Sequence, residues 1–226
     1  MDEFEQLLQS QTGVKVIAPA VSYSSYVLLD LSVSNIILAE INPKNAAEFE
    51  NYVTNHLKIN QAIIAYGGYN ETRNLYKTSS LFKPASVEER NIHIGLDLWT
   101  VAGQPVLAAL DGKIHSFQYN NQLGDYGPTI ILQHQLEGYS FYTLYGHLSL
   151  ESIQNLSKGQ SVTKRQIIAT LGDARVNGGY APHLHFQIIK NIQNKAGDYP
   201  GVCSATNLSF YLSNCPNPNL LLKINS

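Results

Sequence analysis

The chain has 226 residues, of which 44% are hydrophobic and 14% are charged. This composition predicts a globular protein with a sizeable core, built as one large domain or as one domain with an elaborated arm. Lys and Arg number 15 and Asp and Glu number 17, giving a formal net charge of -2. With no basic excess to bind phosphates, we expect no nucleic-acid partner.

No targeting or membrane segment is visible. The chain begins MDEFEQLLQSQTG, with acidic residues where a signal peptide has basic ones. The longest apolar stretches, such as Tyr26–Leu29 and Asn35–Ala39, are far shorter than the ~20 residues that a membrane span needs. We therefore expect no transmembrane segment. We expect a cytoplasmic protein if Met1 is the native start, and a periplasmic or extracellular one if the chain was trimmed.

Residues 1–88 predict an N-terminal α/β extension. A short amphipathic helix is expected around Phe4–Gln9, and apolar runs predict strands at Val14–Ile17, Tyr23–Leu31 and Asn35–Ile41. A second helix is expected to begin at Asn42-Pro43, because Asn caps helices well and Pro suits the first turn. One face of that helix is apolar, at positions Phe49, Tyr52, Val53 and Leu57.

From about Asn91 the sequence changes to short strands separated by turns. Asp111-Gly112 and Glu137-Gly138 are hairpin signals between apolar runs. Strands are predicted at Lys113–Tyr119, Thr129–Gln133, Tyr139–Tyr145, Ile167–Leu171 and His183–Ile189, with one or two helical turns at Ser149–Leu156. Many short strands and little helix favour a mainly β, β-rich α+β fold, with an antiparallel sheet or a curled barrel.

The two cysteines, Cys203 and Cys215, lack the CxxC spacing of a structural zinc site. They are interpreted as packing residues of a C-terminal loop, although a disulfide between them stays open.

Three fragments carry residues suited to chemistry: His93-Ile-Gly-Leu-Asp97, Tyr145-Gly-His147-Leu and His183-Leu-His185. Side chains alternate along a strand, so His183 and His185 project to the same side. His93 and Asp97 share a face whether their segment is extended or helical, and Gly95 leaves that face uncrowded. Two imidazoles and one carboxylate form the ligand set of a catalytic zinc centre, and further histidines could move protons.

The other histidines have no such context. His56 lies on the predicted helix, and His115 and His134 lie in alternating strands. Each is interpreted as structural, since histidine is commonly half-buried with a satisfied nitrogen. HxxxD alone is a weak signal and HxH alone is only suggestive; their joint occurrence, with YGHL between them, is the strong one.

Together these motifs resemble the M23 family of lysostaphin/LytM-type zinc metallopeptidases, over roughly Arg90 to Gln187. The resemblance implies an antiparallel β-sheet groove with the site on its floor. It implies one Zn²⁺ held by His93, Asp97 and His185. It also implies that His147 and His183 orient or deprotonate the metal-bound water and stabilise the tetrahedral intermediate.

The tail around 197–201 and 215–221 is more similar to M23 domains fused with phosphotransferase-like and aminotransferase-like modules. Four further residues are candidates for substrate binding. Tyr69, Asn70 and Arg73 could line the groove or hydrogen-bond the oxyanion, or they could form a solvated loop tied down by Arg73. Tyr145 lies two residues before His147 and so on the same strand face, where it could bound the cleft or pack in the core. Asn70 could instead approach the zinc as an occluding ligand, as in latent members of the family.

The sequence thus predicts an extension or small regulatory arm at 1–88 and an M23-like peptidase domain at 89–226. The implied enzyme is a zinc metalloendopeptidase that cuts peptide bonds in peptidoglycan cross-links or related short peptides. The alternative is a latent or non-catalytic module that retains zinc and binds cell-wall fragments or a partner. A lipoyl-type carrier domain is set aside, because no lysine lies in the Met-Lys turn that such a domain requires.

Overall fold

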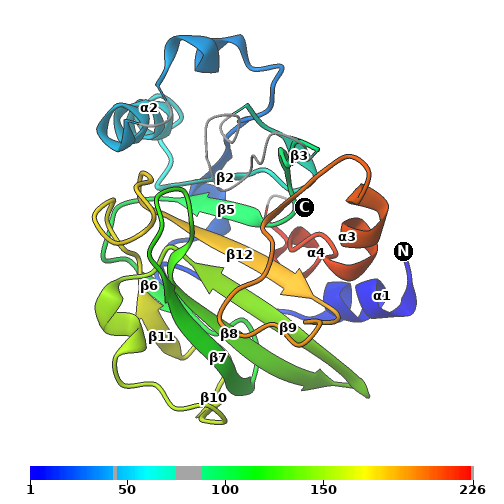
Figure 1. Ribbon diagram of the computed structural model, residues 1–226. Helices are drawn as coiled ribbons and strands as arrows, with labels where there is room; N and C mark the ends of the chain where they lie inside the picture. The colour runs from blue at the N-terminus through cyan, green and yellow to red at the C-terminus, as the bar shows by residue number, and fades with distance from the viewer. Residues whose placement is uncertain (43–44, 75–87, 225–226) are drawn as a thin grey trace.

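The computed structural model describes residues 1–42, 45–74 and 88–224. Its centre is one large twisted sheet, with helices at its ends and edges (Figure 1). In spatial order the eight strands are β1 (Tyr26–Leu28), β2 (Ile64–Gly67), β5 (Leu96–Trp99), β12 (His183–Ile189), β9 (Tyr139–Gly146), β8 (Gly127–Leu136), β7 (Gly112–Asn120) and β10 (Ser161–Val162). β1 and β2 are parallel, and the other neighbours are antiparallel.

Two small sheets and several helices complete the fold. β11 (Ile167–Thr170) pairs with β6 (Pro105–Leu107), and β4 (Ile92–His93) lies between β13 (Val202–Cys203) and β3 (Glu71–Thr72). The helices are α1 (Glu3–Ser10), α2 (Ala46–Ile59), α3 (Leu208–Asn214) and α4 (Asn219–Leu222), with 3₁₀ turns η1 (Tyr23–Ser25), η2 (Ile36–Glu40) and η4 (Leu150–Ile153). No helix of the described ranges is both long and apolar enough to cross a membrane.

The hairpin β8–β9 shows why these residues form strands. Glu137 and Gly138 both have positive φ, 46° and 87°, as the tight turns that match strand twist require. Alternate residues on neighbouring strands then face one core, in which Leu132, Phe141 and Phe186 are fully buried. The fold is thus strand-rich with a mainly antiparallel sheet, and the expected fold class is confirmed.

The predicted strands of the second half are confirmed, whereas two predicted strands of the first half are wrong. Val14–Ile17 makes only an isolated bridge, from Ile17 to Val106. Asn35–Ile41 contains the 3₁₀ turn η2, because the Asn35 side chain accepts a hydrogen bond from Ile37 N. Ile36 is 83% exposed, whereas Leu38 and Ile41 pack against a core cluster that includes Phe49. The spacing of three between the packed residues fits a 3₁₀ turn and not the alternation of a strand.

The predicted helices are present with shifted bounds. α1 covers the expected segment Phe4–Gln9. α2 begins at Ala46, capped by the Asn45 side chain on Glu48 N, and not at Asn42. Pro43, expected in its first turn, lies outside the described residues. The strand expected at Tyr23–Leu31 is reduced to β1 behind the turn η1.

The N-terminal extension continues the large sheet. β2 pairs with β5 in antiparallel register, with Gly67 opposite Asp97. β3 pairs with β4, with Glu71 opposite His93. The extension is therefore joined by backbone hydrogen bonds to two strands that carry candidate site residues.

Candidate metal centre

β5 and β12 bring Asp97 and His185 together. The two strands are antiparallel neighbours, and these two residues are direct partners in the register. Their side chains lie on one face, with His185 Nδ1 3.2 Å from Asp97 Oδ1. Gly95 makes room for the imidazole, because a Cβ at that position would lie 2.3 Å from His185 Cε1. The expectation that Gly95 keeps this face uncrowded is borne out.

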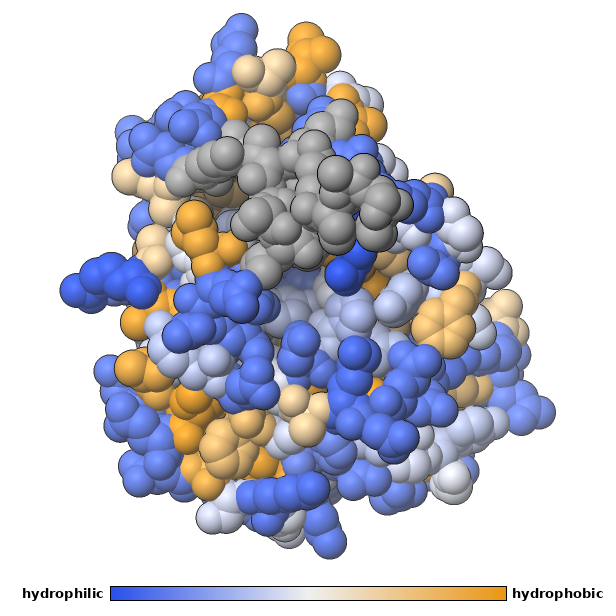
Figure 2. All heavy atoms as spheres, viewed as in Figure 1, coloured by the Kyte–Doolittle hydropathy of each residue, from blue (hydrophilic) through white to orange (hydrophobic). Residues whose placement is uncertain are grey.

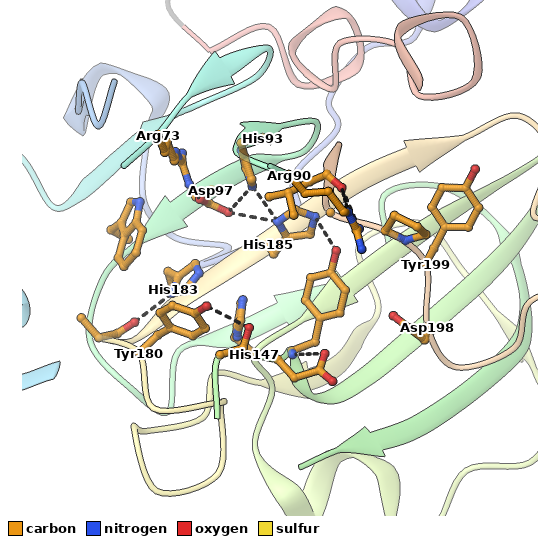
Figure 3. Close-up of a pocket in the computed structure, with 18 of the residues that line it drawn as sticks. Arg73, Arg90, His93, Asp97, His147, Tyr180, His183, His185, Asp198 and Tyr199 are labelled. Atoms are coloured by element: carbon orange, nitrogen blue, oxygen red, sulfur yellow. Dashed lines mark hydrogen bonds and ion pairs between the residues drawn. The ribbon is translucent and has the colours of Figure 1, made fainter. Parts of the chain in front are cut away.

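His93 is the third residue of the group and lies on β4, in the three-stranded sheet. It ends β4, and the chain turns through Ile94 and Gly95 before β5 begins. His93 Nε2 lies 3.0 Å from His185 Nδ1 and 3.3 Å from Asp97 Oδ1. All three side chains are 1–2% exposed, and they form the group of described residues that could hold a metal ion (Figure 3).

Hydrogen bonds on the outer sides of the rings determine which nitrogens carry protons. His93 Nδ1 donates to the Gly68 carbonyl at 2.8 Å, which leaves a lone pair on Nε2 of the neutral ring. His185 Nε2 lies 2.9 Å from Gln187 Oε1, and the Gln187 amide nitrogen donates to Pro200 O. His185 therefore carries its proton on Nε2, and the lone pair of Nδ1 faces the group.

Three acceptor atoms thus face one another with no proton between them. Burial, followed by the charge of Arg73, lowers the pKa of His93 to about 4, so its ring is neutral at pH 7. Burial works to raise the pKa of the Asp97 carboxyl, but the guanidinium of Arg73 beside it holds the pKa well below its usual value. Acceptors 3.0–3.3 Å apart repel one another unless a cation lies among them. The donor set therefore suits a bound metal ion.

His147 and His183 lie beside this group as a second pair, with ring centroids 4.1 Å apart. His147 follows β9 with a left-handed backbone (φ 62°), and its Nδ1 donates to Asn177 O. His183 begins β12, stacks on Trp99 at 3.9 Å, and donates from Nδ1 to Ala181 O. Each neutral ring therefore keeps an acceptor at Nε2.

Burial keeps both of these rings neutral. It lowers the pKa of His183 to about 4. Burial and the neighbouring His183 lower the pKa of His147 well below its usual value. Two neutral, oriented imidazoles next to a possible metal site are suited to accept and return protons.

Comparison with known proteins identifies this arrangement. Residues 91–197 match the model of peptidase family M23. This segment belongs to the M23 peptidases. It contains all five of the residues described above, and the peptidase family named from the sequence is confirmed.

Solved structures give more distant likenesses. The catalytic domain of the antimicrobial peptidase lysostaphin from Staphylococcus simulans is 25% identical, with TM-score 0.40, over 68% of this chain and 95% of that one. Helicobacter pylori Csd3 is 23% identical, with TM-score 0.37, over 65% of this chain and 36% of that one. The catalytic domain of the A109H mutant of the prophage-encoded M23 protein EnpA from Enterococcus faecalis is 21% identical, with TM-score 0.37, over 55% of this chain and 89% of that one.

The chain thus spans about a third of the Csd3 chain that it matches. No curated protein sequence matches it.

The five residues of the M23 segment line one cavity of about 310 Å³. Residues on both sides of the matched segment complete its wall, among them Phe49 and Arg73 before it and Gly201 after it. Charged groups of both signs also line it: Arg90, Lys195, Asp125 and Asp198. Figure 3 shows Arg90 and Asp198 on the side of His185, and Tyr180 on the side of His183. A polar chain crossing the histidines would meet both charge types.

The four residues suggested for substrate binding lie in different surroundings. Arg73 lines the cavity and is 1% exposed. Tyr69 does not line it, and its hydroxyl donates to Cys215 O. Asn70 is an exposed turn residue with φ 54°. Asn70 does not line the cavity, whereas Arg73 contacts Asp97.

Tyr145 is placed in the core and not at the cleft. It is fully buried against Phe186, and its hydroxyl accepts from Ala109 N. The sequence argument took Tyr145 and His147 to share a strand face. β9 ends at Gly146 and the backbone of His147 is left-handed, so the alternation does not extend to His147.

Two contacts of the site were not foreseen. Gln187 is two residues after His185 on β12, so strand alternation could have placed it on the same face. Tyr126, whose hydroxyl lies 3.4 Å from His185 Nε2, precedes β8 in a loop, and no pattern in the sequence singles it out. The cysteines are both buried free thiols, as the packing interpretation expected.

Proposed function

We propose that the protein is a zinc-dependent metalloendopeptidase that hydrolyses peptide bonds in peptidoglycan cross-links or related short peptides. The observation that carries this proposal is the convergence of two imidazole lone pairs and one carboxylate oxygen within 3.0–3.3 Å, beside two further neutral histidines. The M23 family of residues 91–197 supports the peptidase reaction.

The donor set fits zinc in both spacing and chemistry. Ligand atoms 2.0–2.1 Å from a tetrahedral Zn²⁺ lie about 3.3 Å from one another. The three separations here are 3.0, 3.2 and 3.3 Å. Two imidazoles favour zinc over calcium or magnesium, which prefer oxygen ligands. His93, Asp97 and His185 would hold the ion, and three protein ligands leave a position for water or substrate.

The reaction divides between the ion and the two remaining histidines. Zn²⁺ held by His93, Asp97 and His185 would supply Lewis acidity, which lowers the pKa of a bound water to about 7 and polarises a carbonyl. We assign to His147 and His183 the transfer of the proton from the attacking water to the leaving amine. Their Nε2 atoms are acceptors at pH 7, and each ring is oriented by a backbone carbonyl. The protonated ring can also donate to the developing oxyanion.

The cleft supports a polar peptide as substrate. Lys195 can meet a carboxylate, and Asp125 and Asp198 can meet amines. Cross-linking peptides with free charged ends would present both groups.

The test combines metal analysis with cleavage. Purified protein should contain about one zinc per chain and should release peptides from purified sacculi or cleave oligoglycine, with activity lost to a chelator and restored by zinc. His115→Ala is the matched control, since His115 lies outside the cavity on β7. Stoichiometric zinc without cleavage of either substrate would favour the latent module over the peptidase, and absence of zinc would reject the metal centre.

A further inference from the structure

Arg73 is a buried cation in contact with a candidate metal ligand. Its Nη1 lies 2.6 Å from Asp97 Oδ2, and its Nε lies 2.6 Å from Glu71 Oε1. Both side chains of the Arg73–Asp97 pair are 2% exposed. Arg73 lies before residues 91–197, so the extension supplies it to the site of the M23 segment (Figure 3).

The local backbone fixes this position. The pairing of β3 with β4 places Glu71 opposite His93, and Arg73 N donates to Asn91 O just beyond the pair. Gly68 allows the guanidinium to approach, because a Cβ there would lie 1.7 Å from Arg73 Nη2. The φ of Gly68 is 99°, which other residues rarely adopt. Both features hold Arg73 against Asp97.

As a result, the two carboxylate oxygens of Asp97 have different partners. Oδ1 faces His93 Nε2 and His185 Nδ1, and Oδ2 is bound by Arg73. A carboxylate whose second oxygen is engaged by a guanidinium can offer one oxygen to a metal ion. A carboxylate with both oxygens available can bind through both and fill an additional position.

We propose that Arg73 is a positioning residue that holds Asp97 as a one-oxygen ligand and so keeps a coordination position open for water or substrate. This inference rests on the metal centre of the proposed function and is independent of cleavage. Glu71 orients Arg73 in turn and balances part of its charge, because its carboxylate binds Nε on the far side of the guanidinium.

The charge of Arg73 provides a competing expectation. A guanidinium near a divalent cation repels it, so removing Arg73 would tighten metal binding if charge were its main effect. If orientation of Asp97 is its main effect, removal weakens binding, as loss of an outer partner of a metal ligand generally does by 10–100-fold. The direction of the change therefore separates the two roles.

The experiment measures metal binding and coordination without activity. Zinc affinity of Arg73→Met, by competition with a chromophoric chelator, should fall about 10–100-fold. The Co²⁺-loaded variant should show weaker visible absorption than wild type, because a second Asp97 oxygen raises the coordination number. The zinc affinity and Co²⁺ absorption of Arg73→Lys should lie between those of wild type and Arg73→Met, since an ammonium can bind Oδ2 but lacks the planar fork.

Arg175→Met is the matched control. Arg175 also pairs with an aspartate, Asp173, but its side chain is 87% exposed, and the variant should bind zinc as wild type does. Unchanged or tighter zinc binding by Arg73→Met with an unchanged Co²⁺ spectrum would overturn the proposal. If Arg73→Met does not fold, the spectrum and affinity of Arg73→Lys decide by the same criterion. Wild-type protein that binds no zinc would reject the proposed function itself.

Discussion

Two fully buried histidines on the same sheet, His134 on β8 and His185 on β12, show what separates a structural histidine from a metal ligand. His134 has a partner of suitable kind at each nitrogen: Asp111 O at 2.8 Å and the Thr143 hydroxyl at 2.7 Å. His185 has Gln187 on one side, but its other nitrogen faces two acceptors, His93 Nε2 and Asp97 Oδ1. Both rings are buried, but only the Nδ1 lone pair of His185 faces other acceptors, as the donor atom of a metal ligand would.

Because of that difference, we expect His185→Ala to cause the largest loss of bound zinc. The variant removes one of three converging donors, so bound zinc should fall from about one per chain to none, with loss of activity. His134→Ala should keep its zinc. The free energy of unfolding of His134→Ala should be about 1–3 kcal/mol lower than that of wild type, because Asp111 O and the Thr143 hydroxyl lose a buried partner. Metal analysis and urea unfolding of the two variants check both halves, and equal zinc loss in both would contradict the comparison.

The next largest expected effect, on kcat, distinguishes metal ligands from residues that transfer protons. His147→Ala should keep its zinc and lose about 10²–10⁴-fold in kcat, the range expected for removal of a general acid–base group. His147 donates a hydrogen bond to Asn177 O, and its ring centroid lies 6.4 Å from that of His185, so its removal leaves His93, Asp97 and His185 in place. Zinc content and steady-state kinetics are the measurements. If His147→Ala and His185→Ala lost zinc equally, the division of roles would be wrong.

The structural histidine should also be visible in the pH dependence of stability. Burial lowers the pKa of His134 from 6.5 to about 4 in the folded protein. Between these values the unfolded state binds the proton first, so the contribution of His134 to stability is complete above pH 6.5 and is lost as pH falls toward 4. The loss amounts to at most about 3 kcal/mol.

The corresponding measurement is urea unfolding from pH 7 to pH 4, in wild type and in His134→Gln. Both proteins should be examined with chelator present, so that metal release does not contribute. Wild type should lose more free energy of unfolding over this range than His134→Gln does. Parallel pH curves would show that His134 does not titrate as its burial requires.

The sequence predicted the sheet, and it named five candidate residues that line one cavity of the structure, but it did not predict the other contacts of that cavity. Alternation identified β12 and placed His183 beside His185, because strand geometry is local. The same rule failed for Tyr145, since a left-handed residue ended the strand before His147. Asn35–Ile41 has strand-like composition but forms a 3₁₀ turn, because a side-chain cap competes with pairing.

Arg73 and Asp97 are 24 positions apart in the sequence. Their contact depends on the pairing of β3 with β4. Sequence analysis could single out Arg73 as a polar candidate in a loop. It could not supply the partner, because no periodicity links a two-residue strand to the strand that it joins.

The smallest expected changes are in zinc affinity, for variants of two residues near His185 Nε2. Gln187 Oε1 lies at 2.9 Å and fixes the tautomer, whereas the Tyr126 hydroxyl lies at 3.4 Å, beyond a strong hydrogen bond. Gln187→Leu should weaken zinc binding about 10-fold, the lower end of the range for loss of such a partner. Tyr126→Phe should change it less than about 2-fold, because the ring stays in place and the contact that His185 Nε2 loses is a long one. Chelator competition on both variants ranks the two contacts, and a larger loss in Tyr126→Phe would assign the orientation of His185 to the tyrosine.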